Sequence, residues 1–229
     1  MYWGVLNLNA LAKPLGALLK LIFDLTNNYG LSIIIFTVIV KLLTVPLTLK
    51  QTRSMREINE IQPKLKKLQE KYKNDKEQLN VKTLELYKEH NINPFGGCFP
   101  LLIQLPIIVG LFAALREPAK YVFESEAVYK TINTSFLWLT DLAIPDPYLW
   151  GLPLLAGLTT YLSSVTVSTG GPTDQNQKIM TYFMPIMIFW WGKSFPAGLT
   201  LYWVVSNAFQ AIQQLVIRRP QIKIKEGLK

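Results

Sequence analysis

Long apolar runs alternate along the chain with shorter, strongly charged stretches. Five of these runs come close to the roughly 20 residues that a helix needs to cross a bilayer. They are 31–49, 95–115, 148–167, 179–195 and 197–217. Prolines and glycines interrupt the second run, which spanning helices tolerate when their neighbours satisfy the freed backbone groups. The pattern predicts an all-α polytopic membrane protein with five transmembrane helices.

Residues 1–28 have the pattern of an amphipathic helix that lies in the membrane interface. Lys13, Lys20 and Asp24 fall on one face, opposite an apolar stripe. The stripe consists of Leu11, Leu15, Leu18, Ile22 and Leu25. A core helix of a small soluble domain would look the same, but no other soluble segment is present to cover it. The segment also lacks the basic start, unbroken apolar stretch and cleavage site of a signal peptide.

The stretch 50–92 is strongly polar, with eleven Lys/Arg and seven Asp/Glu. Apolar residues recur in it at steps of three and four, before and after a polar turn at 74–76. This periodicity predicts two amphipathic helices that form a helical hairpin outside the bilayer. Pro63 is expected to kink or divide the first of them.

The basic residues set the expected orientation. The 50–92 stretch and the 218–229 tail are both basic, the tail with five Lys/Arg against one Glu, whereas 116–147 has three basic and five acidic residues. The positive-inside rule therefore places hairpin and tail in the cytoplasm and the amino terminus outside. The expected organisation is an interfacial helix at 1–28, transmembrane helices at 29–50, 93–116, 148–168, 179–195 and 196–217, a cytoplasmic hairpin at 51–92, an extracytoplasmic loop at 117–147, a cytoplasmic loop at 169–178 and a basic tail at 218–229.

Lys41 lies in the middle of the first apolar run. An ammonium near the bilayer midplane costs roughly 2.5–3.5 kcal/mol by insertion scales, so such a residue usually faces protein or a water-filled cavity. Thr37, Thr44 and Thr48 are spaced so that they share its helix face. A lysine that snorkels to the interface is the alternative, but the threonines extend the polar stripe in both directions.

The fifth run repeats this pattern, and the second contributes Gln104, which has apolar neighbours on both sides. The polar face of the fifth run comprises Thr200, Trp203, Asn207, Gln210 and Gln214. Hydrogen bonds between helices could explain any single amide. A hydrated cavity among the first, second and fifth spans explains Lys41 and both stripes together. Because no span contains Asp or Glu, the cavity is expected to attract anionic groups and not to relay cations.

Composition narrows the chemistry further. Half of the residues are hydrophobic and 17% are charged, which fits neither a disordered chain nor an ordinary soluble domain. The formal charge of +9 suggests nucleic acid or anionic lipid, but its clustering between apolar runs argues against a specific nucleic acid. Cys98 and His90 are the only residues of their types, so we expect no metal site. No nucleophile–base pair or phosphate-binding loop is recognisable, which predicts neither an enzyme nor a cofactor.

The chain contains three motifs, within 29–47, 93–107 and 195–214, that resemble those of the YidC/Oxa/Alb membrane protein insertases. The stretch 93–100, continuing through Gln104 to Ile107, is similar to the family's second span. The stretches 195–203, 206–207 and 213–214 resemble the fifth, and 29–33, leading to Lys41 and Pro46-Leu47, is similar to the first. The resemblance covers about residues 11 to 217. The absence of a large outer domain resembles the Gram-positive type.

The resemblance implies a bacterial cell membrane protein with a hydrophilic groove that is open to the cytoplasm and the lipid and closed outside. The family usually has arginine where this chain has Lys41, and lysine keeps the charge but lacks the planar fork of donors. Nascent membrane proteins and the lipid bilayer are the implied partners, with the Sec translocon, the ribosome and the signal recognition particle pathway as further candidates.

Two other functions remain open from the residues alone. A small anion or lipid transporter would use the same cationic cavity, and a non-catalytic assembly scaffold would dock other proteins on the hairpin. A transporter requires a path to the outside, whereas the tight turn at 194–197 and the amino-terminal amphipathic helix suggest a covered outer side. A scaffold would not need buried polar stripes.

Overall fold

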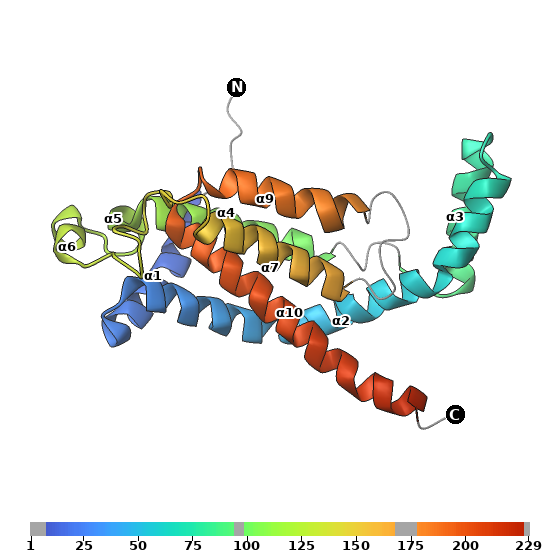
Figure 1. Ribbon diagram of the computed structural model, residues 1–229, viewed down its shortest axis with the longest axis horizontal. Helices are drawn as coiled ribbons and strands as arrows, with labels where there is room; N and C mark the ends of the chain where they lie inside the picture. Colours follow the sequence, from blue (N-terminus) through green and yellow to red (C-terminus); the bar gives the residue numbers. More distant parts are fainter. Residues whose placement is uncertain (1–7, 94–98, 168–177, 227–229) are drawn as a thin grey trace. The chain divides into compact units, whose positions relative to one another are not determined.

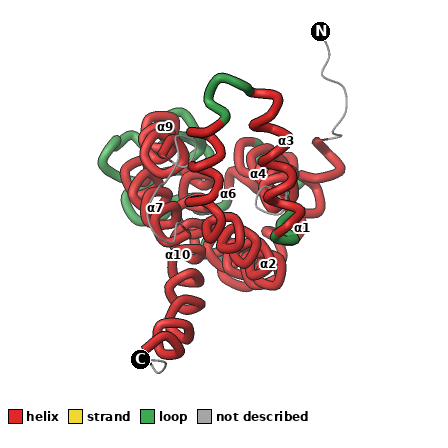
Figure 2. The backbone as a smooth tube through the Cα atoms, turned by 90° about the vertical axis from the view of Figure 1, so that its right-hand side faces the viewer, coloured by secondary structure: helices red, strands yellow, loops and turns green. Residues whose placement is uncertain are grey.

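The computed structural model describes residues 8–93, 99–167 and 178–226. Within this part of the chain the structure is almost entirely helical (Figures 1 and 2), and its one β-type contact is an isolated bridge between Phe136 and Leu139. The all-α prediction is therefore confirmed. The helices are α1 (Leu8–Thr26), α2 (Tyr29–Lys71), α3 (Lys76–Glu89), α4 (Phe99–Arg116), α5 (Pro118–Tyr121), α6 (Glu126–Thr131), α7 (Leu152–Val167), the π-helical turn η1 (Ile179–Phe183), α9 (Met184–Gly192) and α10 (Ala197–Glu226).

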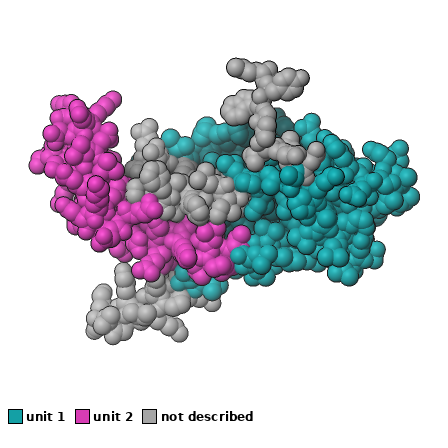
Figure 3. Space-filling model, turned by 180° about the vertical axis from the view of Figure 1, so that it is seen from behind, with its two compact units in different colours: residues 1–43, 105–229 teal, residues 44–104 magenta. Residues whose placement is uncertain are grey.

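The chain forms two compact units, coloured separately in Figure 3. Unit 1 comprises residues 1–43 and 105–229, and unit 2 comprises residues 44–104. Helix α2 contributes its first part to unit 1 and the remainder to unit 2. Each unit has a hydrophobic cluster of its own.

Helix α2 is a single helix of 43 residues. Asn27 precedes it with a positive φ of 50°, a conformation that asparagine tolerates better than most residues. The Asn28 side chain then accepts a hydrogen bond from the backbone N–H of Leu31 and so caps the new helix. The helix continues through Pro63, where the sequence suggests a kink or a break. Among the described residues α2 is the one helix long and apolar enough to cross a membrane, and 105–116 and 152–166 form shorter apolar helices.

Helix α1 packs against protein through a narrow face of small residues. A Cβ atom on Gly16 would collide with the backbone carbonyl of Tyr121 in α5, so α1 approaches α5 as closely as two backbones can. Ala12 and Leu19 are fully buried on the same face, while Leu25 is 80% exposed. The buried face is therefore centred on Ala12, Gly16 and Leu19, and Leu25 of the apolar stripe lies outside it.

Helix α7 lies between α9 and α10 (Figures 1 and 2). Gly157 brings α7 within van der Waals contact of Phe189, and Gly192 brings the end of α9 against Pro153 at the start of α7. On the other side, the Asn207 amide of α10 donates a 2.9 Å hydrogen bond to the Thr160 hydroxyl of α7. Small residues thus let these helices approach closely, as is common where helices pack in membranes.

The loop 132–151 closes one end of unit 1. The backbone N–H groups of Ala197 and Gly198, at the start of α10, donate to the carbonyl oxygens of Ile144 and Leu142 at 2.8 Å each. These bonds satisfy donors that a helix start otherwise leaves without a partner. The Phe136 ring lies directly over Gly30, where a Cβ atom would not fit. The loop therefore ties the beginnings of α2 and α10 together.

In unit 2, helix α3 packs against the second part of α2. The Asp75 carboxylate caps α3 by accepting a 3.0 Å hydrogen bond from the Gln78 N–H. Leu86 of α3 is buried with Ile61 and Leu65 of α2. Unit 2 therefore has a small apolar core of its own beneath its charged surface.

Candidate functional site

Lys41 is buried in unit 1, with 8% of its surface exposed. It follows Tyr29, the first residue of α2, by twelve positions, which is about 18 Å at about 1.5 Å per residue. The Lys41 side chain is therefore enclosed by protein at a position well inside the length of α2. A lysine that snorkels along a lipid-facing surface would instead expose its stem.

Two of the threonines near Lys41, Thr37 and Thr48, donate their hydroxyl groups to carbonyl oxygens of α2. Thr37 is fully buried, and its hydroxyl donates to the Ile33 carbonyl at 2.6 Å. The Thr48 hydroxyl donates at 3.0 Å to the carbonyl of Thr44. Such bonds make threonine acceptable at membrane depth while its oxygen lone pairs stay available to another donor. Thr44 and Thr48 belong to unit 2.

Gln104 lies in α4, but its side chain is outside the described residues. It stays a predicted site residue on the strength of the sequence.

The first positions of the α10 stripe contact α7 and α9. Thr200 is buried, and its hydroxyl donates to the Pro196 carbonyl at 3.3 Å. Thr200 and Trp203 line a small hollow among α7, α9 and α10, and Asn207 binds Thr160 of α7. The other residues that line the hollow are Ala156, Ile188, Gly192, Phe195 and Leu199. This part of the stripe therefore includes a contact that holds α10 to α7.

The last positions of the stripe are Gln210 and Gln214. Gln210 is half-buried and Gln214 is 3% exposed. The Gln214 amide is therefore enclosed by protein, and a buried amide group is costly unless it is hydrogen-bonded.

Helix α7 carries buried polar residues that the sequence analysis did not identify. Thr160 and Ser163 are 7% and 5% exposed, and Ser206 on α10 is 7% exposed. The signal was present as small residues at steps of four and three, Ala156, Thr160 and Ser163. This spacing is typical of a packing face between membrane helices.

Among the described residues, the buried charged side chains are Lys41 and Asp146. The Asp146 carboxylate accepts hydrogen bonds from Trp138 Nε1 at 3.1 Å and from the backbone N–H of Leu152 at 2.7 Å. Asp146 thus serves the loop 132–151. The described part of the chain contains no cluster of His, Cys, Asp or Glu that could hold a metal ion.

A buried cation among hydroxyl and amide groups can attract and hydrogen-bond an anionic group. The described residues around it offer hydrogen-bond donors and acceptors. Such a site is suited to transient binding.

The sequence is similar to proteins of known family along most of its length. A family model described as 60Kd inner membrane protein matches residues 21–225. The membrane protein insertase YidC of Fusobacterium nucleatum is 42% identical over 214 residues, which cover 92% of this chain and 96% of that relative. The membrane protein insertase YidC of Caldanaerobacter subterraneus is 40% identical over 216 residues, covering 94% and 97% of the two chains.

A solved structure is also similar in fold. It is described as an active YidC insertase crystal structure with the first transmembrane domain resolved, and it matches with a TM-score of 0.66 and 28% sequence identity. The match covers 93% of this chain and 46% of that chain, so this chain spans about half of the solved one. The chain therefore belongs to the 60Kd inner membrane protein family, the YidC/Oxa/Alb insertases.

Proposed function

We propose that this chain is a membrane protein insertase of the bacterial inner membrane and that Lys41 is the centre of its substrate groove. The observation that carries the proposal is a lysine buried deep in an apolar helix, in a chain 42% identical to a membrane protein insertase. The chain acts by binding and releasing substrate, and not as an enzyme that makes or breaks covalent bonds.

The proposed topology has five spans. The first part of α2, α4, α7, η1 with α9, and α10 cross the membrane, with the amino terminus outside and the 51–92 hairpin and the basic tail in the cytoplasm. The apolar composition of α2 and of the shorter apolar helices 105–116 and 152–166 supports three of the spans. The apolar runs 179–195 and 197–217 support the other two. The excess of Lys and Arg in 50–92 and 218–229 supports the orientation.

The proposed groove is lined by polar residues of α2, α4 and α10. They are Thr37, Lys41, Thr44, Thr48, Gln104, Thr200, Trp203, Asn207, Gln210 and Gln214. A polar substrate flank that enters hydrocarbon loses its hydrogen bonds at a cost of several kcal/mol for each unsatisfied group. A wet groove supplies partners for that flank partway into the bilayer and so lowers the barrier.

Lys41 would hold an acidic flank transiently. Two unit charges about 4 Å apart attract by roughly 4 kcal/mol at an effective dielectric constant near 20, which is enough to bias entry without trapping the substrate. The apolar segment that follows then leaves sideways into lipid, where burial of its surface drives the step. The membrane potential adds a further driving force on acidic flanks.

The groove is proposed to be closed on the outer side. The hydrogen bonds from Ala197 and Gly198 to the loop 132–151 support closure. The Phe136 ring over Gly30 supports it as well, because it leaves no space between the loop and the start of α2. A substrate would thus enter from the cytoplasm and leave only through the lipid-facing side.

Nascent membrane proteins are the proposed substrates, and the bilayer is the medium that receives them. The charged surface of unit 2 and the basic tail are the proposed contact regions for the ribosome, the signal recognition particle pathway or the Sec translocon. Their excess of Lys and Arg supports contacts with acidic surfaces.

Reconstitution tests the function directly. The purified protein in liposomes should insert a single-span substrate, seen as a membrane-protected fragment after external proteolysis, and empty liposomes should not. Insertion no greater than in empty liposomes would contradict the proposal. Flux of a small anion through the same proteoliposomes would then favour a transporter.

A further inference from the structure

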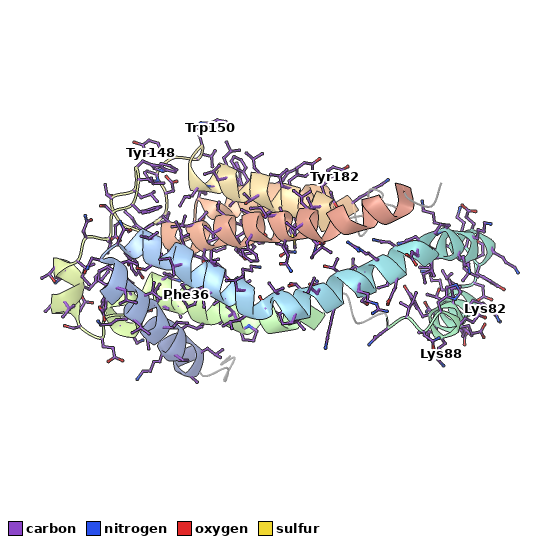
Figure 4. The ribbon with its side chains drawn as sticks, turned by 90° about the horizontal axis from the view of Figure 1, so that it is seen from below. Phe36, Lys82, Lys88, Tyr148, Trp150 and Tyr182 are labelled. Atoms are coloured by element: carbon purple, nitrogen blue, oxygen red, sulfur yellow. The ribbon has the colours of Figure 1, made fainter. Side chains whose placement is uncertain are left out.

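Several large aromatic side chains are exposed at one end of α7 and α9. Trp150 and Tyr148 are 76% and 59% exposed, and Trp190 and Trp191 are 56% and 51% exposed. Figure 4 shows Tyr148 and Trp150 pointing away from the helices. We call these four residues the aromatic collar. Exposed aromatic surface of this extent usually marks an interaction site.

The two parts of the aromatic collar belong to neighbouring segments. Gly192, which ends α9, packs so closely on Pro153 that a Cβ atom there would lie 3.2 Å from the Pro153 backbone. Trp190 and Trp191 immediately precede Gly192, and Trp150 lies just before Pro153. The collar therefore gathers at one end of the α7–α9 pair.

The chain around Trp150 is held in place by a buried carboxylate. Asp146 accepts hydrogen bonds from Trp138 Nε1 at 3.1 Å and from the backbone N–H of Tyr148 and Leu152 at 2.9 and 2.7 Å. A Cβ atom on Gly151 would collide with this carboxylate. These contacts therefore fix the position of the segment that carries Trp150.

The chemistry of the aromatic collar fits the polar headgroup layer of a bilayer. Trp and Tyr have amphipathic rings that concentrate at membrane interfaces. The Lys193 ammonium lies 4.0 Å above the Trp190 ring, so a cation that could pair with lipid phosphates accompanies the exposed rings. Further along α7, Leu155, Leu158 and Leu162 are exposed and apolar. The collar is therefore continuous with a surface suited to lipid tails.

We propose that the aromatic collar, together with Lys193, anchors the outer ends of α7 and α9 in the headgroup layer of the outer leaflet. This inference rests on the proposed function, in which α7 and α9 span the membrane. The anchor would fix the depth of both helices. Since α10 is bound to α7 through Asn207 and Thr160, it would fix the depth of the groove as well.

Fluorescence of single-tryptophan variants tests the anchor. One variant keeps Trp150 and a control keeps Trp203, with the other five of the six tryptophans replaced by phenylalanine. In proteoliposomes, Trp150 should be quenched several-fold more by lipids labelled near the headgroup than by lipids labelled at the chain end, and only weakly by aqueous iodide. Iodide quenching like that of free indole, or protection from every quencher, would overturn the anchor.

A spin label covers the case in which these variants fold poorly. A label at Trp150→Cys, in a Cys98→Ser background, should collide more with oxygen than with a water-soluble nickel complex, and a label at Glu124→Cys should do the reverse. Equal behaviour of the two labels would contradict the anchor. Proteoliposomes with the unchanged protein are tested for resistance to carbonate extraction and for substrate insertion. Extraction or lack of insertion contradicts the proposed function, while a water-exposed Trp150 in an inserting protein contradicts the anchor alone.

Discussion

Single residues show how buried polar groups are tolerated in this protein. Thr37 and Thr48 donate to carbonyl groups of their own helix, and Asn207 donates to Thr160 on a neighbouring helix. Spacing along the sequence predicts that such residues share a face, but it does not predict the partner. The Asn207 contact could not be foreseen because it depends on which helix packs beside α10.

The hydrogen bonds that Asp146 accepts are expected to stabilise the protein. Asp146→Ala leaves the Trp138 indole and two backbone N–H groups without their acceptor, and a hydrogen bond to a charged group contributes about 1.5–3 kcal/mol. We expect the free energy of unfolding in detergent to fall by at least about 2 kcal/mol. Asp146→Asn keeps one acceptor oxygen and should lose less. Equal stability of Asp146→Ala and the unchanged protein would contradict this role.

Helices are the elements that the sequence predicts best, because apolar length and periodicity determine whether they form. Their buried faces are less predictable. In α1 the buried face contains Gly16, since only glycine leaves room for the Tyr121 carbonyl at that distance. A close contact of this kind cannot be predicted from the hydrophobicity pattern. In α2 the first apolar run and the amphipathic segment after it form one helix, because the helix continues through both prolines, Pro46 and Pro63.

The contact between α7 and α10 predicts a measurable coupling. In a double-mutant cycle of Asn207→Leu and Thr160→Val, the interaction energy should be about 0.6 kcal/mol and no more than about 1.7 kcal/mol, as for other hydrogen bonds between membrane helices. The measurement is the free energy of unfolding in detergent of the unchanged protein, the two single variants and the double variant. Strict additivity of the two single changes would show that the hydrogen bond contributes nothing.

We expect the two faces of each groove helix to differ in their access to water. Single cysteines at Thr44 and Gln210, in a Cys98→Ser background, should react with charged thiol reagents from the cytoplasmic side. Cysteines at Leu43 and Ile212, which are 73% and 62% exposed on apolar surface, should stay unreactive because lipid disfavours the thiolate. If both members of each pair react alike, the groove is not hydrated.

The whole molecule consists of two compact units with separate cores. The charge pattern predicts a separate hairpin at 51–92, because that stretch alternates in hydrophobicity but is far too polar to enter lipid. Unit 2 is longer than this stretch, since it begins at residue 44 and ends at residue 104. The apolar periodicity of the hairpin singles out Ile61, Leu65 and Leu86, and all three lie in the core of unit 2. It does not predict which of them meet, since Leu86 reaches Ile61 and Leu65 only after the chain has turned at Asp75.

Separate cores predict separate stability. Leu86→Asp places a charge in the small core of unit 2 and should detach α3 from α2, making 72–92 sensitive to protease. The core of unit 1 shares no residue with this cluster, so a protease-resistant membrane fragment should remain. Leu84→Asp, at a position that is 55% exposed, is the matched control. Loss of the resistant fragment in Leu86→Asp would show that the two units depend on each other.

The central claim, that the charge of Lys41 captures acidic substrate flanks, is tested most directly by insertion yields. Proteoliposomes with Lys41→Arg, Lys41→Ala or Lys41→Glu receive two substrates that differ only in an acidic or a neutral translocated flank. Lys41→Arg should keep insertion of both. Lys41→Ala should lower the insertion yield mainly of the acidic-flank substrate. Lys41→Glu should lower that yield further, because like charges about 4 Å apart repel by several kcal/mol at an effective dielectric constant near 20. An equal loss for both substrates with Lys41→Ala would contradict electrostatic capture.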